Sequence, residues 1–161
     1  MSAKQFVLLV VTSLLAACAS TPTFNTAGVD LKLTPEAVLA QSSTSLGQTA
    51  LWGGTILRLQ NLEDSTRIEI LAYPLDSTQR PDPNNKPLGR FMIHQPGFLD
   101  PANYSQGRLI SVLGQVGESQ DAKIGDSSYI YPVIDAQQLK LWPEKKSNTQ
   151  GHFSFGLGIR L

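Results

Sequence analysis

Residues 50–142 contain five short segments that favour β-strands, and turn-forming residues separate them. The segments are rich in Val, Ile and Leu, and several alternate apolar with polar positions, the period of a strand with one buried face. They span residues 50–60, 66–73, 89–94, 108–118 and 129–142. Five strands in so short a stretch predict one small, mainly β domain.

Two glycines, Gly53 and Gly54, lie together inside the first of these segments. A glycine pair within a strand usually marks a bulge or a sharp coil. A coiled first strand, with a turn at Asp100-Pro101 between the third and fourth segments, favours a small OB-like five-stranded barrel. A small sandwich is the main alternative, and a lipocalin would need eight strands. A short N-terminal helix is expected over residues 34–40, because Thr34 can cap it and proline suits its first position.

An uncharged run of twelve residues, 6–17, precedes this domain and follows a single positive charge at Lys4. As a helix it would reach about 18 Å at about 1.5 Å per residue, which is short of the ~30 Å hydrocarbon core of a bilayer. Residues 1–17 are therefore interpreted as a signal peptide rather than as a permanent span.

The apolar run ends in Leu15-Ala16-Ala17-Cys18, which resembles a bacterial lipobox, and Cys18 is the only cysteine of the chain. In proteins with this motif the Cys sulfur receives a diacylglycerol, the peptide is cut before the Cys, and the new amine is acylated. Several acyl chains hold a protein far more firmly than one, since each buried methylene contributes roughly 0.8 kcal/mol. Cys18 is thus the predicted lipidation site.

The residue after the lipobox is Ala19 rather than Asp, which usually retains Gram-negative lipoproteins in the inner membrane. We therefore expect the protein in the outer membrane, lipid-anchored, with its domain at the periplasmic leaflet. Residues 18–33 are small and mostly polar, and they predict a lipidated N-terminus and tether ahead of the domain at 34–142. The expected partner is outer-membrane lipid, contacted through the acyl chains on Cys18.

Residues 143–161 predict a polar linker followed by an extra C-terminal strand. Alternate positions of that strand are apolar, namely Phe153, Phe155, Leu157, Ile159 and Leu161. Strict alternation over nine residues is typical of a strand with one apolar face. A single strand cannot span lipid alone, because its edges would be unsatisfied. It is expected to pair with an edge of its own barrel or with an edge of an envelope protein partner.

The chain carries 13 basic and 13 acidic side chains, so its formal net charge is zero. A neutral chain has no broad electrostatic attraction to nucleic acid, and no nucleic-acid partner is expected. One Cys and two distant His provide no set of ligands for a zinc or iron–sulfur site. Neither a metal nor a cofactor is expected.

Two local patterns resemble functional motifs but lack required parts. Gly125-Asp126-Ser127-Ser128 is similar to the Gly-Asp-Ser block of one esterase class, yet His152 has no acid three residues before it. Residues 82–86 contain Asp and Asn as a calcium loop does, yet Lys86 stands where a ligand is required. No catalytic residue is predicted, and the protein is expected not to be an enzyme.

Aromatic and arginine side chains in the domain are candidates for a ligand-binding face, as barrels of this type bind oligonucleotides and oligosaccharides. The candidates are Trp52, Arg67, Arg90, Tyr104 and Arg108. Aromatic residues of small barrels more often pack in the core or at the rim. If the arginines shared one face, they would favour an anionic group of the envelope.

Seven blocks of residues, in order from about residue 34 to residue 142, carry a resemblance to a known family. The blocks are Trp52-Gly53-Gly54-x-Ile56, Glu69-Ile70-x-Ala72-Tyr73-Pro74-Leu75-Asp76, Gly89-Arg90-Phe91, Gly97-Phe98-Leu99-Asp100-Pro101 with Tyr104, Gly107-Arg108-Leu109, Gly114, and Tyr131-Pro132-Val133. Together, behind a lipobox, they resemble the Slp family of outer-membrane lipoproteins.

This resemblance implies an outer-membrane lipoprotein that is linked to starvation, stationary phase and acid stress and has no established enzymatic activity. The favoured hypothesis is therefore a non-enzymatic lipoprotein of the Gram-negative envelope, structural or stress-related. The alternative is a periplasmic binding module for an envelope glycan, a lipid headgroup or a protein partner. A binding module should gather its aromatic and arginine side chains in one exposed groove, whereas a structural protein should bury them.

Overall fold

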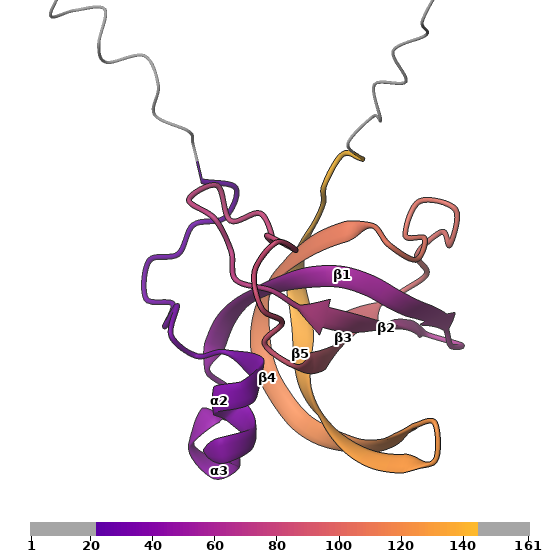
Figure 1. The fold of residues 1–161 in the computed structure, drawn as a ribbon, viewed down its shortest axis with the longest axis horizontal. Helices are drawn as coiled ribbons and strands as arrows, with labels where there is room; N and C mark the ends of the chain where they lie inside the picture. The colour runs from indigo at the N-terminus through magenta and orange to yellow at the C-terminus, as the bar shows by residue number, and fades with distance from the viewer. Residues whose placement is uncertain (1–21, 145–161) are drawn as a thin grey trace, which may run out of the picture.

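The computed structural model describes residues 22–144, which form a closed five-stranded barrel (Figure 1). The strands are β1 (Thr49–Asn61), β2 (Ser65–Ala72), β3 (Arg90–Pro96), β4 (Leu109–Ile124) and β5 (Ser127–Leu141). They follow the order β1-β2-β3-β5-β4 around the barrel, and only β3 and β5 pair in parallel. This confirms the predicted mainly β, OB-like five-stranded barrel.

Strand alternation places the core as expected from the sequence. In β2, Ile68 and Ile70 point inward and are fully buried, while Arg67 and Glu69 point outward. Burying an aliphatic side chain of this size contributes roughly 1.5–3 kcal/mol relative to leaving it exposed. At the centre of the core the rings of Trp52 and Phe91 meet edge to face, with centroids 5.1 Å apart.

The two glycines of β1 lie where this strand changes partners. Gly54 is paired with Ala72 of β2 and with Ile110 of β4, so both neighbouring strands flank it. A Cβ atom on Gly54 would collide with the backbone carbonyl of Leu71, and one on Gly53 would lie 2.9 Å from the carbonyl oxygen of Ile110. The glycines are therefore required for close strand approach at the coil of β1.

Helix α2 (Pro35–Ala40) covers one end of the barrel and contributes Val38 to the core. Its start agrees with the prediction, because Thr34 Oγ1 accepts a hydrogen bond from the backbone N–H of Ala37 at 3.2 Å and proline occupies the first turn. The next segment contains a second short helix, α3 (Ser42–Ser45), which the sequence did not predict. Hydroxyl groups of Thr44 and Ser45 donate to the Gln41 carbonyl and help close this turn.

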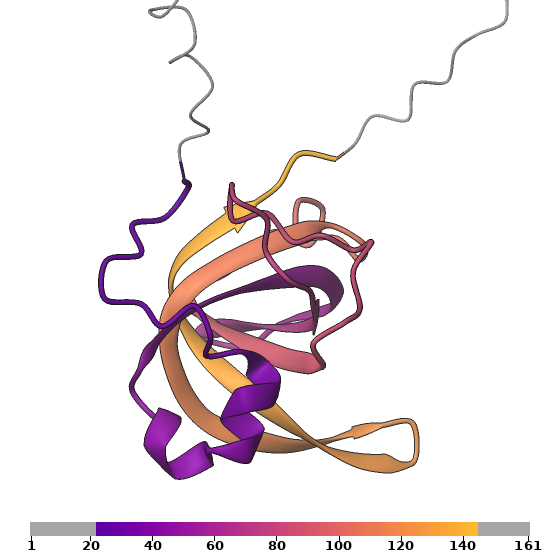
Figure 2. The same cartoon turned by 60° about the vertical axis from the view of Figure 1, so that its left-hand side comes forward.

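The turn-rich connection expected over residues 119–128 is instead a hairpin arm. Strand β4 continues to Ile124, only Gly125 and Asp126 form the turn, and β5 resumes at Ser127. The arm extends beyond the barrel in Figures 1 and 2, with most of its side chains exposed. Only Ala122 and Ile124 alternate with exposed residues in the β4 part of the arm, so the apolar pattern there is too short to predict a strand.

Residues 22–33 were expected to be a tether, yet this segment is attached to the barrel at two points, Phe24 and Leu33, while most residues between them are exposed. The Phe24 side chain is buried, and the backbone N–H of Phe24 donates to Oε1 of Gln79 at 2.6 Å. Nε2 of Gln79 returns a bond to the Phe24 carbonyl at 3.1 Å. Leu33 is buried as well, and its carbonyl accepts from the indole N–H of Trp52.

Three predictions fall outside the described residues, namely the signal peptide, Cys18 and the C-terminal strand. Within residues 22–144, no helix combines the length and the apolar character needed to cross a membrane.

We predict that Gly54→Ala lowers the free energy of unfolding by about 1–3 kcal/mol, because the new methyl group overpacks a site between two strands. Thermal and urea unfolding of the mature chain measure the change. Gly117→Ala in β4 is the matched control, since a Cβ atom there would first meet only the carboxylate of Asp135, which can move. Equal stability of both variants and the wild type would show that the close approach at Gly54 is not limiting.

Candidate functional site

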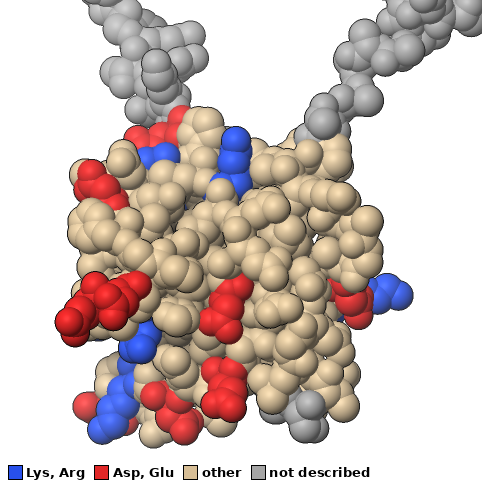
Figure 3. All heavy atoms as spheres, turned by 180° about the vertical axis from the view of Figure 1, so that it is seen from behind, with Lys and Arg blue, Asp and Glu red and all other residues tan. Residues whose placement is uncertain are grey.

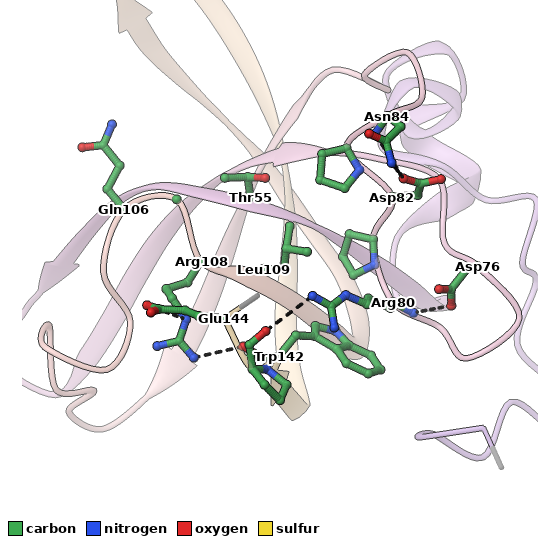
Figure 4. A pocket seen from close by; sticks show the side chains of 14 residues that line it. Thr55, Asp76, Arg80, Asp82, Asn84, Gln106, Arg108, Leu109, Trp142 and Glu144 are labelled. Atoms are coloured by element: carbon green, nitrogen blue, oxygen red, sulfur yellow. Dashed lines mark hydrogen bonds and ion pairs between the residues drawn. The ribbon is translucent and has the colours of Figure 1, made fainter. Parts of the chain in front are cut away.

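A cleft of about 910 Å³ opens at the side of the barrel where the described chain ends (Figure 4). Its walls come from the β2–β3 loop (residues 73–89), from residues 106–109 at the start of β4, and from residues 142–144 after β5. Its lining comprises Thr55, Asp76, Arg80, Pro81, Asp82, Pro83, Asn84, Gln106, Gly107, Arg108, Leu109, Trp142, Pro143 and Glu144. Thr55 of β1 completes the lining, so segments from four parts of the sequence meet here.

The Trp142 ring forms one wall and is held by a chain of hydrogen bonds. Its indole N–H donates to Oγ of Ser111 at 2.9 Å, and that fully buried hydroxyl donates to the carbonyl of Gln79 at 2.7 Å. The guanidinium carbon of Arg80 lies 5.5 Å from the ring centroid, within cation–π range. Arg80 also donates to the Pro143 carbonyl at 3.4 Å, so it joins the β2–β3 loop to the end of the described chain.

Arg108 forms the opposite wall, and most of its donors are already used. Nη1 donates to the Asn103 carbonyl and Nη2 to the Trp142 carbonyl, each at 3.0 Å. Nε is buried without a hydrogen bond among the described residues, although the Glu144 carboxylate lies 3.5 Å away as an ion-pair partner. Arg108 therefore fastens the β3–β4 loop to the segment after β5.

Two carboxylates of the cleft shape the loop that carries them. Oδ1 of Asp76 accepts from the backbone N–H and hydroxyl of Thr78, at 2.8 and 2.6 Å, and from the backbone N–H of Arg80 at 3.0 Å. The Thr78 hydroxyl is the main cause that lowers the pKa of Asp76, so this side chain is charged at neutral pH. Asp82 accepts from the side chains of Asn84 and Asn85, both at 2.8 Å.

A second, smaller cavity of about 310 Å³ lies between residues 31–35 and the barrel. Leu33, Leu51, Trp52, Leu75 and Leu88 are among its apolar lining residues. It shares Asp76 with the first cleft, so the β2–β3 loop borders both cavities.

The structure does not bring the five sequence-predicted ligand residues together. Trp52 lies in the core at the edge of the smaller cavity, and Tyr104 packs half-buried against the core. Arg67 and Arg90 project from the outer faces of β2 and β3, and only Arg108 lines the large cleft. In the described part of the chain, Arg67, Arg90 and Arg108 therefore do not form a common site that could bind an anion.

The outer face of β2 and β3 holds a separate polar network. Oε1 of Glu69 accepts from Nη1 of Arg90 at 2.7 Å and from the Tyr131 hydroxyl at 2.8 Å. The backbone N–H of Arg90 donates to the hydroxyl of Tyr129 at 3.1 Å, and the rings of Tyr129 and Tyr131 lie edge to face. Burial, with the Glu69 contact, raises the pKa of Tyr131, and the same carboxylate raises the pKa of Arg90. This network joins β5 to β2 across β3.

Sequence reasoning overlooked the cleft because its lining comes mainly from a loop without strand or helix. Arg80, Asp76 and Asp82 lie among the prolines of that loop, and only their association with Trp142 makes a site. The local signal was a concentration of charged and amide side chains in a proline-rich segment.

Among the described residues, no group of three metal-ligating side chains gathers. Figure 3 shows acidic and basic side chains dispersed on the face it presents, without a large patch of one sign among the described residues.

Comparison with known proteins identifies a matching family and three similar proteins. A family model described as the outer membrane lipoprotein Slp family matches residues 15–156. The chain is similar to the outer membrane protein Slp of Escherichia coli K12, with 32% identity over 160 residues that cover 96% of this chain and 84% of that protein. It is 35% identical to the uncharacterized lipoprotein YeaY of the same strain, over 65% of this chain and 54% of YeaY.

An uncharacterized protein of Haemophilus influenzae is 33% identical over 63% of this chain and 56% of its own length. The chain thus spans about half the length of two of these relatives. Among solved structures, a small single-stranded DNA-binding protein from Streptomyces coelicolor is similar over 59% of this chain and 94% of that one, with 14% identity and a TM-score of 0.37. So low a score carries no inference about ligands.

We predict that Tyr131 ionises at a higher pH than a free tyrosine, because burial and the Glu69 contact favour its neutral hydroxyl and raise its pKa. A raised folded-state pKa means that this contribution to stability is present below the unfolded value of about 10 and is lost as the pH rises through the folded value. Ultraviolet titration of tyrosinate should show a late step that disappears in Tyr131→Phe. Tyr129→Phe should retain the step, and its loss there instead would contradict the assignment.

Proposed function

The chain belongs to the outer-membrane lipoprotein Slp family, and on this premise we propose that it is a non-enzymatic envelope lipoprotein held by acyl chains on Cys18. The lipobox supplies the thiol for acylation directly ahead of the described domain. The barrel would then serve a structural or stress-related role at the membrane surface, during starvation and stationary phase.

The observation that carries this proposal is the fixed position of Phe24 on the barrel. Phe24 lies six positions after Cys18, and a fully extended chain of that length spans at most about 20 Å. Because the bonds between Phe24 and Gln79 hold this point, an acylated Cys18 keeps the β2–β3 loop close to the lipid surface. The expected position is the periplasmic leaflet of the outer membrane.

The physiological role is tested by deleting the gene and measuring survival after prolonged stationary phase and after acid challenge. Reduced survival that the wild-type gene restores supports the stress-related role. A Cys18→Ser gene that restores survival equally well would show that the anchor is dispensable. Unchanged survival of the deletion strain under both conditions would contradict the stress-related role itself.

A second candidate function, that of a periplasmic binding module, is favoured by the cleft described above. A purely structural barrel has no need of a wide cleft lined by charged and amide side chains. A photo-crosslinking amino acid in place of Gln106, an exposed lining residue, tests this in intact cells. A binding module should give a specific crosslinked product. The same crosslinker in place of the exposed Gln138 of β5, which does not line the cleft, is the control and should give none.

We predict that Cys18 is the only site of acylation. Metabolic labelling with a radiolabelled fatty acid should mark the wild-type protein and leave Cys18→Ser unlabelled, because the chain has no other thiol. Immunoblots establish that both proteins are present in equal amounts. Label that persists in the variant would contradict the prediction.

We further predict that Ala19→Asp moves the protein toward the inner membrane, since an acidic residue after the lipidated Cys usually retains lipoproteins there. Separation of the two membranes in a sucrose gradient measures the distribution. Ala19→Ser, which keeps a small uncharged side chain, is the control and should stay with the outer membrane. If Ala19→Asp also stays with the outer membrane, this residue does not direct sorting.

A further inference from the structure

The lining of the large cleft combines charges of both signs without an excess that selects an ion. It contains the carboxylates of Asp76, Asp82 and Glu144 and the guanidinium groups of Arg80 and Arg108. A phosphate or polyanion would approach three carboxylates, and a cation would approach two guanidinium groups. A hydrocarbon would strip water from all five charges, which is costly without replacement hydrogen bonds. The charge pattern therefore favours a neutral polar ligand.

Several polar groups of the cleft have hydrogen-bonding capacity left. The guanidinium of Arg80 forms no ion pair with a described carboxylate, and the one hydrogen bond of this side chain, to the Pro143 carbonyl, is long at 3.4 Å. Asp76 uses Oδ1 for all its bonds within the loop, which leaves Oδ2 available among the described residues. The amide of Gln106 is exposed and makes no hydrogen bond within residues 22–144. Free donors and free acceptors are thus interspersed.

We propose that this cleft binds a hydroxyl-rich saccharide of the cell envelope. A hydroxyl group donates one hydrogen bond and accepts two, so a saccharide satisfies adjacent donors and acceptors in a way that an ion of one sign cannot. Sugar rings also carry apolar C–H faces, which can lie on the prolines and the Trp142 wall of the cleft. The volume lies in the upper part of the 300–1,000 Å³ range of small-molecule sites, which leaves room for more than one ring.

A lipid anchor on Cys18 would hold this cleft where envelope saccharides are accessible. The β2–β3 loop supplies Arg80 and Asp82 to the cleft and also seats Phe24, the point that leads to Cys18. A lipid-anchored chain therefore holds the cleft near the membrane surface. Peptidoglycan strands and the core of lipopolysaccharide share the required chemistry. The inference rests on the second candidate function and specifies its ligand class.

The test is isothermal titration calorimetry on the lipidated mature chain, in a detergent without a sugar headgroup. Two saccharide probes separate the sources: peptidoglycan glycan oligomers stripped of stem peptides, and dephosphorylated core oligosaccharide of lipopolysaccharide. Glycerol phosphate is the anion probe. Saturable binding of at least one saccharide is expected, with little dependence on salt, because neutral ligands are not screened.

Arg80→Gln should weaken saccharide binding about tenfold, the usual effect of losing one hydrogen bond to a charged group. Arg58→Gln is the matched control with the same change of charge, because Arg58 is exposed on β1 and does not line the cleft. Gln106→Ala, an exposed substitution that leaves the core intact, provides a second lining variant and should weaken binding as well.

Binding of glycerol phosphate in place of the saccharides, or of no probe at all, would overturn the proposal. Equal binding by Arg80→Gln, Gln106→Ala and the wild type would overturn it too, since saccharide would then bind elsewhere. Crosslinks from position 106 in cells report separately on the second candidate function. Crosslinking without saccharide binding would keep the binding module and reject this ligand class.

Discussion

Closure of the barrel depends on the close approach of three strands at the glycine pair of β1. At Gly54 the strand leaves β4 and joins β2, and the backbone carbonyl of Leu71 occupies the space that a side chain would need. Only a strand without a Cβ atom at this point lets both neighbours pair with it. The core around Trp52, the order of the strands and the position of the loops all follow from this closure.

The β2–β3 loop connects the N-terminal segment of the described chain with the cleft. Gln79 is its central residue, because its side chain binds both backbone groups of Phe24 while its carbonyl accepts from Ser111. Ser111 in turn holds the indole of Trp142. One loop residue therefore couples the segment that leads to Cys18 with a wall of the cleft. This arrangement explains why a loop without regular structure can be well packed.

The polar network on β2, β3 and β5 has a mainly architectural explanation. Glu69 and Arg90 bond to each other and Glu69 also to the buried Tyr131, at the seam where the sheet has its only parallel pairing. That pairing involves only three residues of each strand. Side-chain bonds across β3 supplement a seam with few backbone bonds. Arg90, proposed from sequence as a ligand residue, is used in this way.

The sequence alone determined those features that depend on local chemistry. Alternation in β2, the glycine pair in β1 and the Thr34 cap each act over a few residues, so they predicted five strands, a coiled first strand and the first helix. The extended β4–β5 arm escaped prediction, because most of its side chains are exposed and its few apolar residues give too short a pattern for strand prediction. The attachment of Phe24 to the barrel was not predicted either, since one aromatic residue in a polar stretch does not identify the residues that it contacts.

Only the tertiary structure decided which side chains meet. Trp52 and Trp142 are both tryptophans in or next to a strand, yet Trp52 fills the core and Trp142 lines a cleft. Arg67, Arg90 and Arg108 are all strand-associated, yet strand direction and register send them to different faces. Arg80 gains its role from Trp142, which lies 62 positions later in the chain. Such contacts depend on closure of the barrel, a property of the whole chain that no local pattern encodes.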